Sequence, residues 1–245
     1  MILCSSHCLP RCRFLLSTMR RNLAVLIALV SLTSNNSAAQ KDSVPQVVDR
    51  ASLPRWVAPL GIAASLALDP EAREWSQRQH THFLDQLAKL ANPLGTARRL
   101  VPTMAFTFAA AALTHHESVA SGALNTAAAY VASDLVESAL KPMIGRERPH
   151  VEGNSRRFHP FTANGDWHSM PSAHVAHIAS IATAVSMQMH STPVTAIGSA
   201  LVALVSWDRV YEDQHWTSDV TTTVALSTAV ASATVRWLES RRQRH

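Results

Sequence analysis

Residues 171–207 read PSAHVAHIASIATAVSMQMHSTPVTAIGSALVALVSW, and this stretch decides the fold class. It holds two apolar runs, 175–189 and 194–207, which are separated by Ser191-Thr-Pro193. Neither run reaches about 18 strongly apolar residues without a polar interruption, so we predict two buried helices of a bundle rather than membrane spans. Short helices rich in Ala, Ser and Thr can also pack inside a membrane bundle, and this alternative stays open.

The sequence on both sides of this stretch extends the helical pattern. The segment 71–90 is the clearest amphipathic one, and we expect a single helix that Asn92-Pro-Leu-Gly95 ends. The Ala-rich segment 118–140 should end near Lys141, because the residue before a proline disfavours the helical conformation. The polar segment 151–170 is expected to form a loop over the site. No strand-like alternation, hairpin signal or internal repeat stands out, so the sequence predicts an all-α fold, a helical bundle.

The N-terminal region has the order of a secretory signal peptide. Four arginines precede the ten-residue apolar run 23–32, and the small residues Ser37-Ala-Ala39 follow it. Ten residues are too few to span a bilayer, although an uncleaved amphipathic anchor is an alternative. We therefore predict a signal peptide over 1–39, a polar lead-in with amphipathic helices over 40–95 and a folded domain over 96–240. The predicted localisation is secretion to the periplasm.

The charge and the cysteine content argue against nucleic-acid binding and against sites built from cysteine. The segment 1–39 contains four Arg and no Lys, Asp or Glu, so its removal lowers the formal net charge from +5 to +1. No basic face on the mature chain is indicated, and nucleic acid is not an expected partner. All three cysteines lie within the first twelve residues, which leaves the folded body without a disulfide framework or a thiolate metal site.

Three segments carry cations, histidines and hydroxyl groups suited to phosphoryl chemistry. They are Lys141-Pro-Met-Ile-Gly-Arg-Glu-Arg148-Pro149, Pro171-Ser-Ala-His174 and Arg209-Val-Tyr-Glu-Asp-Gln-His215-Trp-Thr-Ser-Asp219. A phosphate ester offers anionic oxygens to cations, and it needs a nucleophile and an acid for the leaving oxygen. Taken singly, the first segment is typical of a basic helix end and the second of an ordinary helix start. The third, taken singly, is typical of two side chains that pair on a helix surface.

The spacing of His215 and Asp219 would place both side chains on one face of a helix. A carboxylate there could keep one ring nitrogen protonated and leave the other nucleophilic. The segment 171–174 lies where a polar loop meets an apolar helix, so its free amides could bind an anion.

Together the three segments resemble the motifs of the type 2 phosphatidic acid phosphatase superfamily, which also includes vanadium haloperoxidases. The family motifs are Lys-x6-Arg-Pro, Pro-Ser-Gly-His and Ser-Arg-x5-His-x3-Asp, and the resemblance covers about residues 100–235. Two positions depart from the motifs. Ala173 replaces a glycine, which tightens the approach of phosphate to the backbone. Asp208 replaces a serine and can pair with Arg209, which would weaken the hold of that arginine on phosphate.

The resemblance implies a role for each matched residue. His215 would attack phosphorus and form a phosphohistidine, Asp219 would orient His215, and His174 would protonate the leaving oxygen. The implied phosphate-binding residues are Lys141, Arg148, Ser172, Ala173 and Arg209. No metal and no other cofactor is expected, because Asp219 is the only motif carboxylate assigned to the chemistry and it is committed to His215.

The function expected from this resemblance is a metal-independent phosphatase acting on phosphomonoesters or diphosphates. The expected substrate is a phosphorylated small molecule or a lipid phosphate. The lipid is included because the apolar stretches would allow the protein to associate with a membrane surface. The alternatives are a vanadate-dependent haloperoxidase, with vanadate as cofactor, and a non-catalytic phosphate-binding protein associated with the membrane. The sequence does not determine the oligomeric state.

Overall fold

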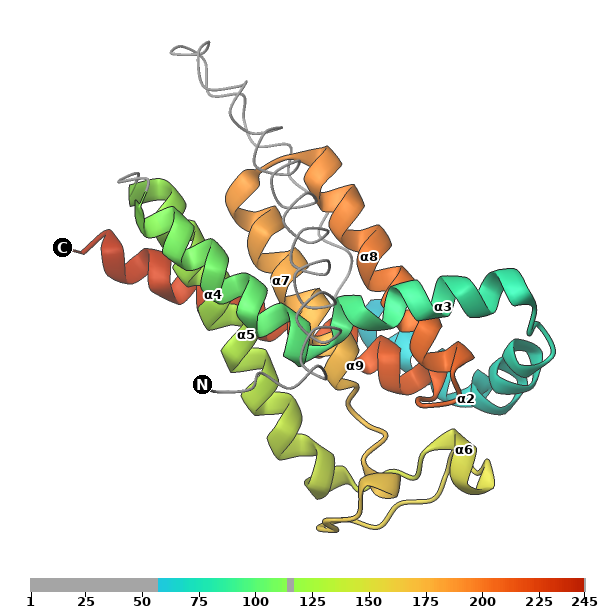
Figure 1. Ribbon diagram of the computed structural model, residues 1–245. Coiled ribbons are helices and arrows are strands. Elements are labelled where there is room, and N and C mark those ends of the chain that lie inside the picture. The colour runs from blue at the N-terminus through green and yellow to red at the C-terminus, as the bar shows by residue number, and fades with distance from the viewer. Residues whose placement is uncertain (1–56, 114–116, 245) are drawn as a thin grey trace, which may run out of the picture. The chain divides into compact units, whose positions relative to one another are not determined.

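The computed structural model describes residues 57–113 and 117–244, and these residues are helical with short connections. The predicted signal peptide 1–39 and the lead-in up to residue 56 lie outside the described residues. The all-α prediction is confirmed (Figure 1). The elements are α2 (Val57–Gln77), α3 (His82–Gly95), α4 (Ala97–Leu113), α5 (Glu117–Ile144), α6 (Pro149–Glu152), the 3-10 helix η1 (Gly165–Trp167), α7 (Ala173–Met189), α8 (Thr192–Tyr211) and α9 (Thr217–Arg242).

Helix α7 is the central element of the bundle. It packs against α5, α8 and α9 along its length and against α3 near its start (Figure 1). One buried cluster joins α7 to α8 and α9 through Val175, Ile178, Val205 and Val220. A second cluster is built from small side chains on α5, α7 and α9, including Ala129, Ala184 and Ala231, which let the helices approach closely. The start of α7 is thereby fixed among its neighbours.

The expected single helix over 71–90 is wrong, because the chain turns between α2 and α3. Helix α2 continues through Pro70 to Gln77, and α3 begins after Thr81. The Thr81 hydroxyl accepts a hydrogen bond from the Leu84 amide at 3.3 Å, which caps α3. The apolar spacing across 71–90 therefore belongs to two helices with separate buried faces.

Helix α5 also differs from the prediction, since it passes Lys141 and Pro142 and ends at Ile144. Gly145 follows with a φ of 59°, in the left-handed region that favours glycine. A Cβ at this position would lie 1.9 Å from the His159 carbonyl oxygen. The helix therefore ends where a glycine allows a sharp change of direction, rather than at the residue before the proline.

The predicted loop 151–170 begins in the last turn of α6, contains η1 and is hydrogen bonded to residues 146–148. The Arg148 amide donates to the Asp166 carbonyl at 2.8 Å, and the Ser169 amide donates to the Arg146 carbonyl at 3.0 Å. These bonds place Ser169 close to the segment that carries His215. None of the helices in the described ranges combines the length and apolar character needed to cross a membrane.

Candidate active site

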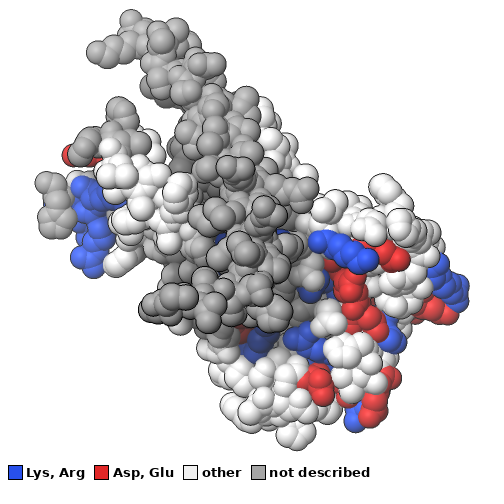
Figure 2. Space-filling view, viewed as in Figure 1, with Lys and Arg blue, Asp and Glu red and all other residues white. Residues whose placement is uncertain are grey.

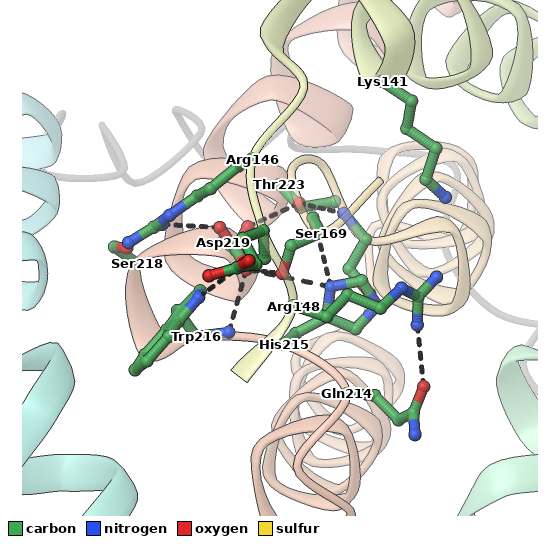
Figure 3. A network of polar contacts seen from close by, with 12 residues as sticks. Lys141, Arg146, Arg148, Ser169, Gln214, His215, Trp216, Ser218, Asp219 and Thr223 are labelled. Atoms are coloured by element: carbon green, nitrogen blue, oxygen red, sulfur yellow. Dashed lines mark hydrogen bonds and ion pairs between the residues drawn. The ribbon is translucent and has the colours of Figure 1, made fainter. Parts of the chain in front are cut away.

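His215 is buried in the short connection between α8 and α9. Its amide donates to the Arg209 carbonyl at 3.2 Å, which holds the residue against the end of α8. Its Nδ1 donates to the Ser169 carbonyl at 2.5 Å, because a carbonyl oxygen can only accept. A neutral ring in this state carries its lone pair on Nε2, which is the arrangement a nucleophilic histidine needs (Figure 3).

Asp219 lies near His215 but makes no direct hydrogen bond to its ring, since His215 precedes α9 and is not on its helical face. The shortest distance between the two, from Nδ1 to Oδ2, is 3.9 Å. Oδ2 of Asp219 instead accepts from the Trp216 amide at 2.8 Å and from the Ser169 hydroxyl at 2.5 Å. The carboxylate thus caps α9 and holds the residue whose carbonyl binds His215. Burial raises the pKa of Asp219, and Arg146 opposes that shift.

Arg146 ties Asp219 to Asp69 of α2, and the sequence analysis singled out neither Arg146 nor Asp69. Its Nη1 donates to Asp219 Oδ1 at 2.6 Å, and its Nη2 donates to Asp69 Oδ2 at 2.6 Å. Asp69 also accepts from the Ser218 amide and hydroxyl at the start of α9. All three charged side chains are fully buried. A buried cation between two carboxylates, with its remaining donors bonded, anchors the start of α9 (Figure 3).

His174 occupies the first turn of α7, where the sequence placed it. Its Nε2 lies 3.2 Å from Asn92 Oδ1 and 3.3 Å from Thr96 Oγ1, both at the end of α3. Gly95 allows this contact, because a Cβ there would lie 2.7 Å from the Cβ of His174. The segment 92–96 is therefore part of the site as well as a helix end.

The three predicted cations act on both histidines. Lys141, Arg148 and Arg209 each lower the pKa of His215 and of His174. Burial is the largest cause in both cases, and the pKa of His174 falls to about 4. The charged ends of Lys141 and Arg148 lie on the same side of the His215 ring (Figure 3). Side chains from α5, α7 and α8 thus contribute to one electropositive site.

Ser172 and Ala173 begin α7 beside these cations. The Ser172 side chain is buried, and its hydroxyl has no hydrogen-bond partner among the described residues. The Ser172 amide is not free, since it donates to Thr223 Oγ1 at 2.8 Å. The amides of Ala173 and His174 lie in the first turn, where a helix offers donors without partners inside the helix. This end of α7 can bind an anion through a hydroxyl and backbone amides.

Three other side chains in or near the motif-bearing segments have structural partners. Tyr211 is buried and donates to Asp85 Oδ1 at 2.5 Å, and Trp216 donates to the Glu147 carbonyl at 2.9 Å. His177 bridges the Gly95 carbonyl and the Asp134 carboxylate, each at 2.8 Å. Across 57–113 and 117–244, no group of three or more His, Cys, Asp or Glu side chains is arranged to hold a metal ion.

Residues 122–243 match the model of the PAP2 superfamily. No curated protein sequence matches the chain. The crystal structure of a transmembrane PAP2 type phosphatidylglycerolphosphate phosphatase from Bacillus subtilis is similar, with a TM-score of 0.58 and 18% identity over 75% of this chain and 94% of that one. Aquifex aeolicus LpxE is similar with a TM-score of 0.56 and 20% identity, over 69% and 95% of the two chains. These structures share the fold. The family match, the three motifs and the fold together show that the chain belongs to the PAP2 superfamily.

Proposed function

We propose that this protein is a phosphatase that hydrolyses phosphomonoesters or diphosphates, without a metal, through a phosphohistidine at His215. The observation that carries the proposal is the placement of His215 and His174 in the field of the same three cations. The Ser169 carbonyl accepts a hydrogen bond from Nδ1 of His215, which supports attack by Nε2 of the same ring. Cations fixed around a buried nucleophile stabilise the negative charge of a phosphoryl transition state.

In this mechanism, Nε2 of His215 forms a bond to phosphorus as the bond to the leaving oxygen breaks. Lys141, Arg148 and Arg209 bind the remaining oxygens, with the Ser172 hydroxyl and the Ala173 amide as further donors. His174 gives its proton to the leaving oxygen and then takes a proton from the water that cleaves the phosphohistidine. The negative charge of a bound phosphate raises the pKa of His174 and favours the protonated ring that the first step needs.

We further propose that the substrate is a lipid phosphate and that the protein associates with a membrane surface. Helix α4 is largely apolar, and Phe106, Phe108 and Leu113 on it are exposed. Mixed charges gather on the visible surface over α2 and α3 (Figure 2). One structurally similar protein is described as a transmembrane phosphatidylglycerolphosphate phosphatase. An apolar face beside the site would let the headgroup reach the cations from a lipid surface. Secretion to the periplasm stays a prediction.

A phosphate-release screen with the purified protein tests the proposal. Lipid phosphates, prenyl diphosphates and small monoesters are compared with EDTA present. We expect release from at least one class and a loss of more than about a thousandfold in His215→Ala. The matched control is His82→Ala, which removes an exposed histidine of α3. Equal activity of the wild type and His215→Ala would refute the assignment. Peroxidase turnover with vanadate and peroxide, without phosphate release, would favour the haloperoxidase alternative.

A further inference from the structure

Two of the three phosphate-binding cations already have a carboxylate partner. Lys141 forms an ion pair with Glu137 one turn earlier on α5, and the Glu137 side chain is buried. Arg209 donates through Nε and Nη2 to Asp208 Oδ2, at 2.8 and 2.5 Å. The Asp208 side chain is fully buried. Each pair therefore places a negative charge next to a cation of the site in a poorly solvated environment.

Arg148 differs from the other two cations because its hydrogen bonds go to neutral oxygens. It donates to Gln214 Oε1 at 2.7 Å and to the Gly165 carbonyl at 3.1 Å. Burial lowers the pKa of Arg148, and the charges of Asp166, Asp219 and, more weakly, Glu137 oppose that shift. The influence of Glu137 thus extends beyond its own ion pair to a second phosphate-binding cation.

The charge balance of this group limits what it can bind well. Counting only these three cations and the two carboxylates paired with them, the net charge is about +1 if both histidines are neutral. Asp219 is paired separately with Arg146. A phosphate monoester carries one negative charge below a pKa of about 6 and two above it. Such a site compensates a single negative charge. The second charge of a dianion is repelled by Glu137 and Asp208.

We propose that Glu137 and Asp208 are specificity-determining residues that make the site prefer phosphoryl groups with one negative charge over dianions. The substrate class is then the singly charged form of a phosphate ester, and this inference rests on the proposed phosphatase function. Asp208 stands where the family motif has a serine, so its charge is an addition relative to that motif. One oxygen of Asp208, Oδ1, is buried and has no hydrogen-bond partner in the described part of the chain.

The ionisation of Asp208 determines the pH at which this preference should be measured. Burial raises the pKa of Asp208 to about 6, and Arg209 opposes the shift. The other charged group that acts on Asp208 is Glu212, which directly follows the end of α8. At about pH 9 the carboxylate is ionised, so its charge can oppose a dianion.

Calorimetric titration at about pH 9 with two small ligands tests the inference. Methylphosphonate carries two negative charges at this pH, and its monomethyl ester carries one. We expect the full-length protein to bind the monomethyl ester more tightly. Asp208→Asn and Glu137→Gln should each shift the ratio of the two Kd values toward methylphosphonate by about tenfold, because each removes one buried negative charge. Glu212→Gln, which removes an exposed charge just after the end of α8, should leave the ratio unchanged.

The outcomes separate this inference from the proposed function. A ratio that stays the same in both variants, or tighter wild-type binding of methylphosphonate, overturns the inference whether or not the enzyme turns over. Absence of phosphate release from every substrate overturns the proposed function and leaves the ligand ratio measurable. If thermal melting shows that Asp208→Asn is unfolded, Asp208→Ser restores the family residue and serves as the second variant.

Discussion

At the residue scale, the position of Arg146 shows how a buried charge is stabilised. Its guanidinium joins carboxylates from α2 and α9, and Asp219 in turn holds Ser169 beside His215. The resemblance to the family motifs identified His215 and Asp219 as candidates, because both lie in one motif. It could not identify the bond between Asp69 and Arg146, since 77 positions separate them and no periodicity relates them.

Replacing Arg146 with methionine should destabilise the protein strongly. The change leaves Asp69 and Asp219 buried without their cation, at a cost of about 3–5 kcal/mol. Urea unfolding measures this loss. Arg78→Met is the control, because Arg78 pairs with Glu74 on the surface and such a pair contributes about 1 kcal/mol or less. A similar stability for both variants would contradict the proposed role of Arg146.

His174 should make the stability of the protein fall as the pH is lowered. Its pKa is about 4 in the folded chain against 6.5 for an ordinary histidine. Between these values the unfolded chain binds a proton that the folded chain does not, so the free energy of unfolding decreases from the upper value to the lower. His174→Gln should therefore gain stability relative to wild type when the pH drops through this window. Urea midpoints at both ends of the window measure the difference, and parallel pH curves for the two proteins would refute it.

At the element scale, glycines decide where helices end and meet. Gly145 ends α5 with a left-handed backbone, and Gly95 lets α3 lie against the start of α7. The sequence indicated that helices occupy these regions, but it did not give their ends. The α5 end and the turn between α2 and α3 depend on close contacts with distant backbone and on capping by Thr81, which apolar periodicity does not report.

Gly95→Ala should reduce both activity and stability. The new Cβ would lie within 2.9 Å of three atoms of His174, so α3 must shift away from the first turn of α7. Overpacking of this kind costs about 1–3 kcal/mol, and displacement of His174 should lower kcat more than it raises KM.

Gly61→Ala is the matched control for this change. Gly61 lies in α2 with no atom within 4 Å of the added Cβ, so alanine should keep activity and add about 0.5–1 kcal/mol of stability. Thermal melting and steady-state kinetics measure both variants. Wild-type kcat in Gly95→Ala would show that the contact with α3 does not position His174.

At the scale of the whole molecule, large apolar side chains stay exposed on several helices, α4 among them. Composition and the absence of strand patterns were sufficient to predict an all-α fold, because long runs rich in Ala, Val and Leu bury one another as helices. They did not show which apolar side chains stay outside the core. Phe106 and Phe108 on α4 remain 49% and 43% exposed, and this follows only from how α4 packs on α5 and α3.

The double variant Phe106→Ser and Phe108→Ser should bind lipid vesicles about tenfold more weakly than wild type, because it removes apolar area that would enter the lipid. Cosedimentation with phosphatidylglycerol vesicles measures the binding. The control is Leu60→Ser with Leu68→Ser, which removes two exposed leucines from α2. Equal losses of vesicle binding in the two double variants would show that membrane binding does not depend specifically on α4.

The Asp69 carboxylate lies upstream of the segment 122–243 that matches the family. An excised fragment with those limits would keep the full motif set and still lack the counterion of Arg146. Its guanidinium would face the protein interior with one carboxylate instead of two. The smallest autonomous piece of this chain must therefore include Asp69, and motif borders are a poor guide to where the chain can be cut.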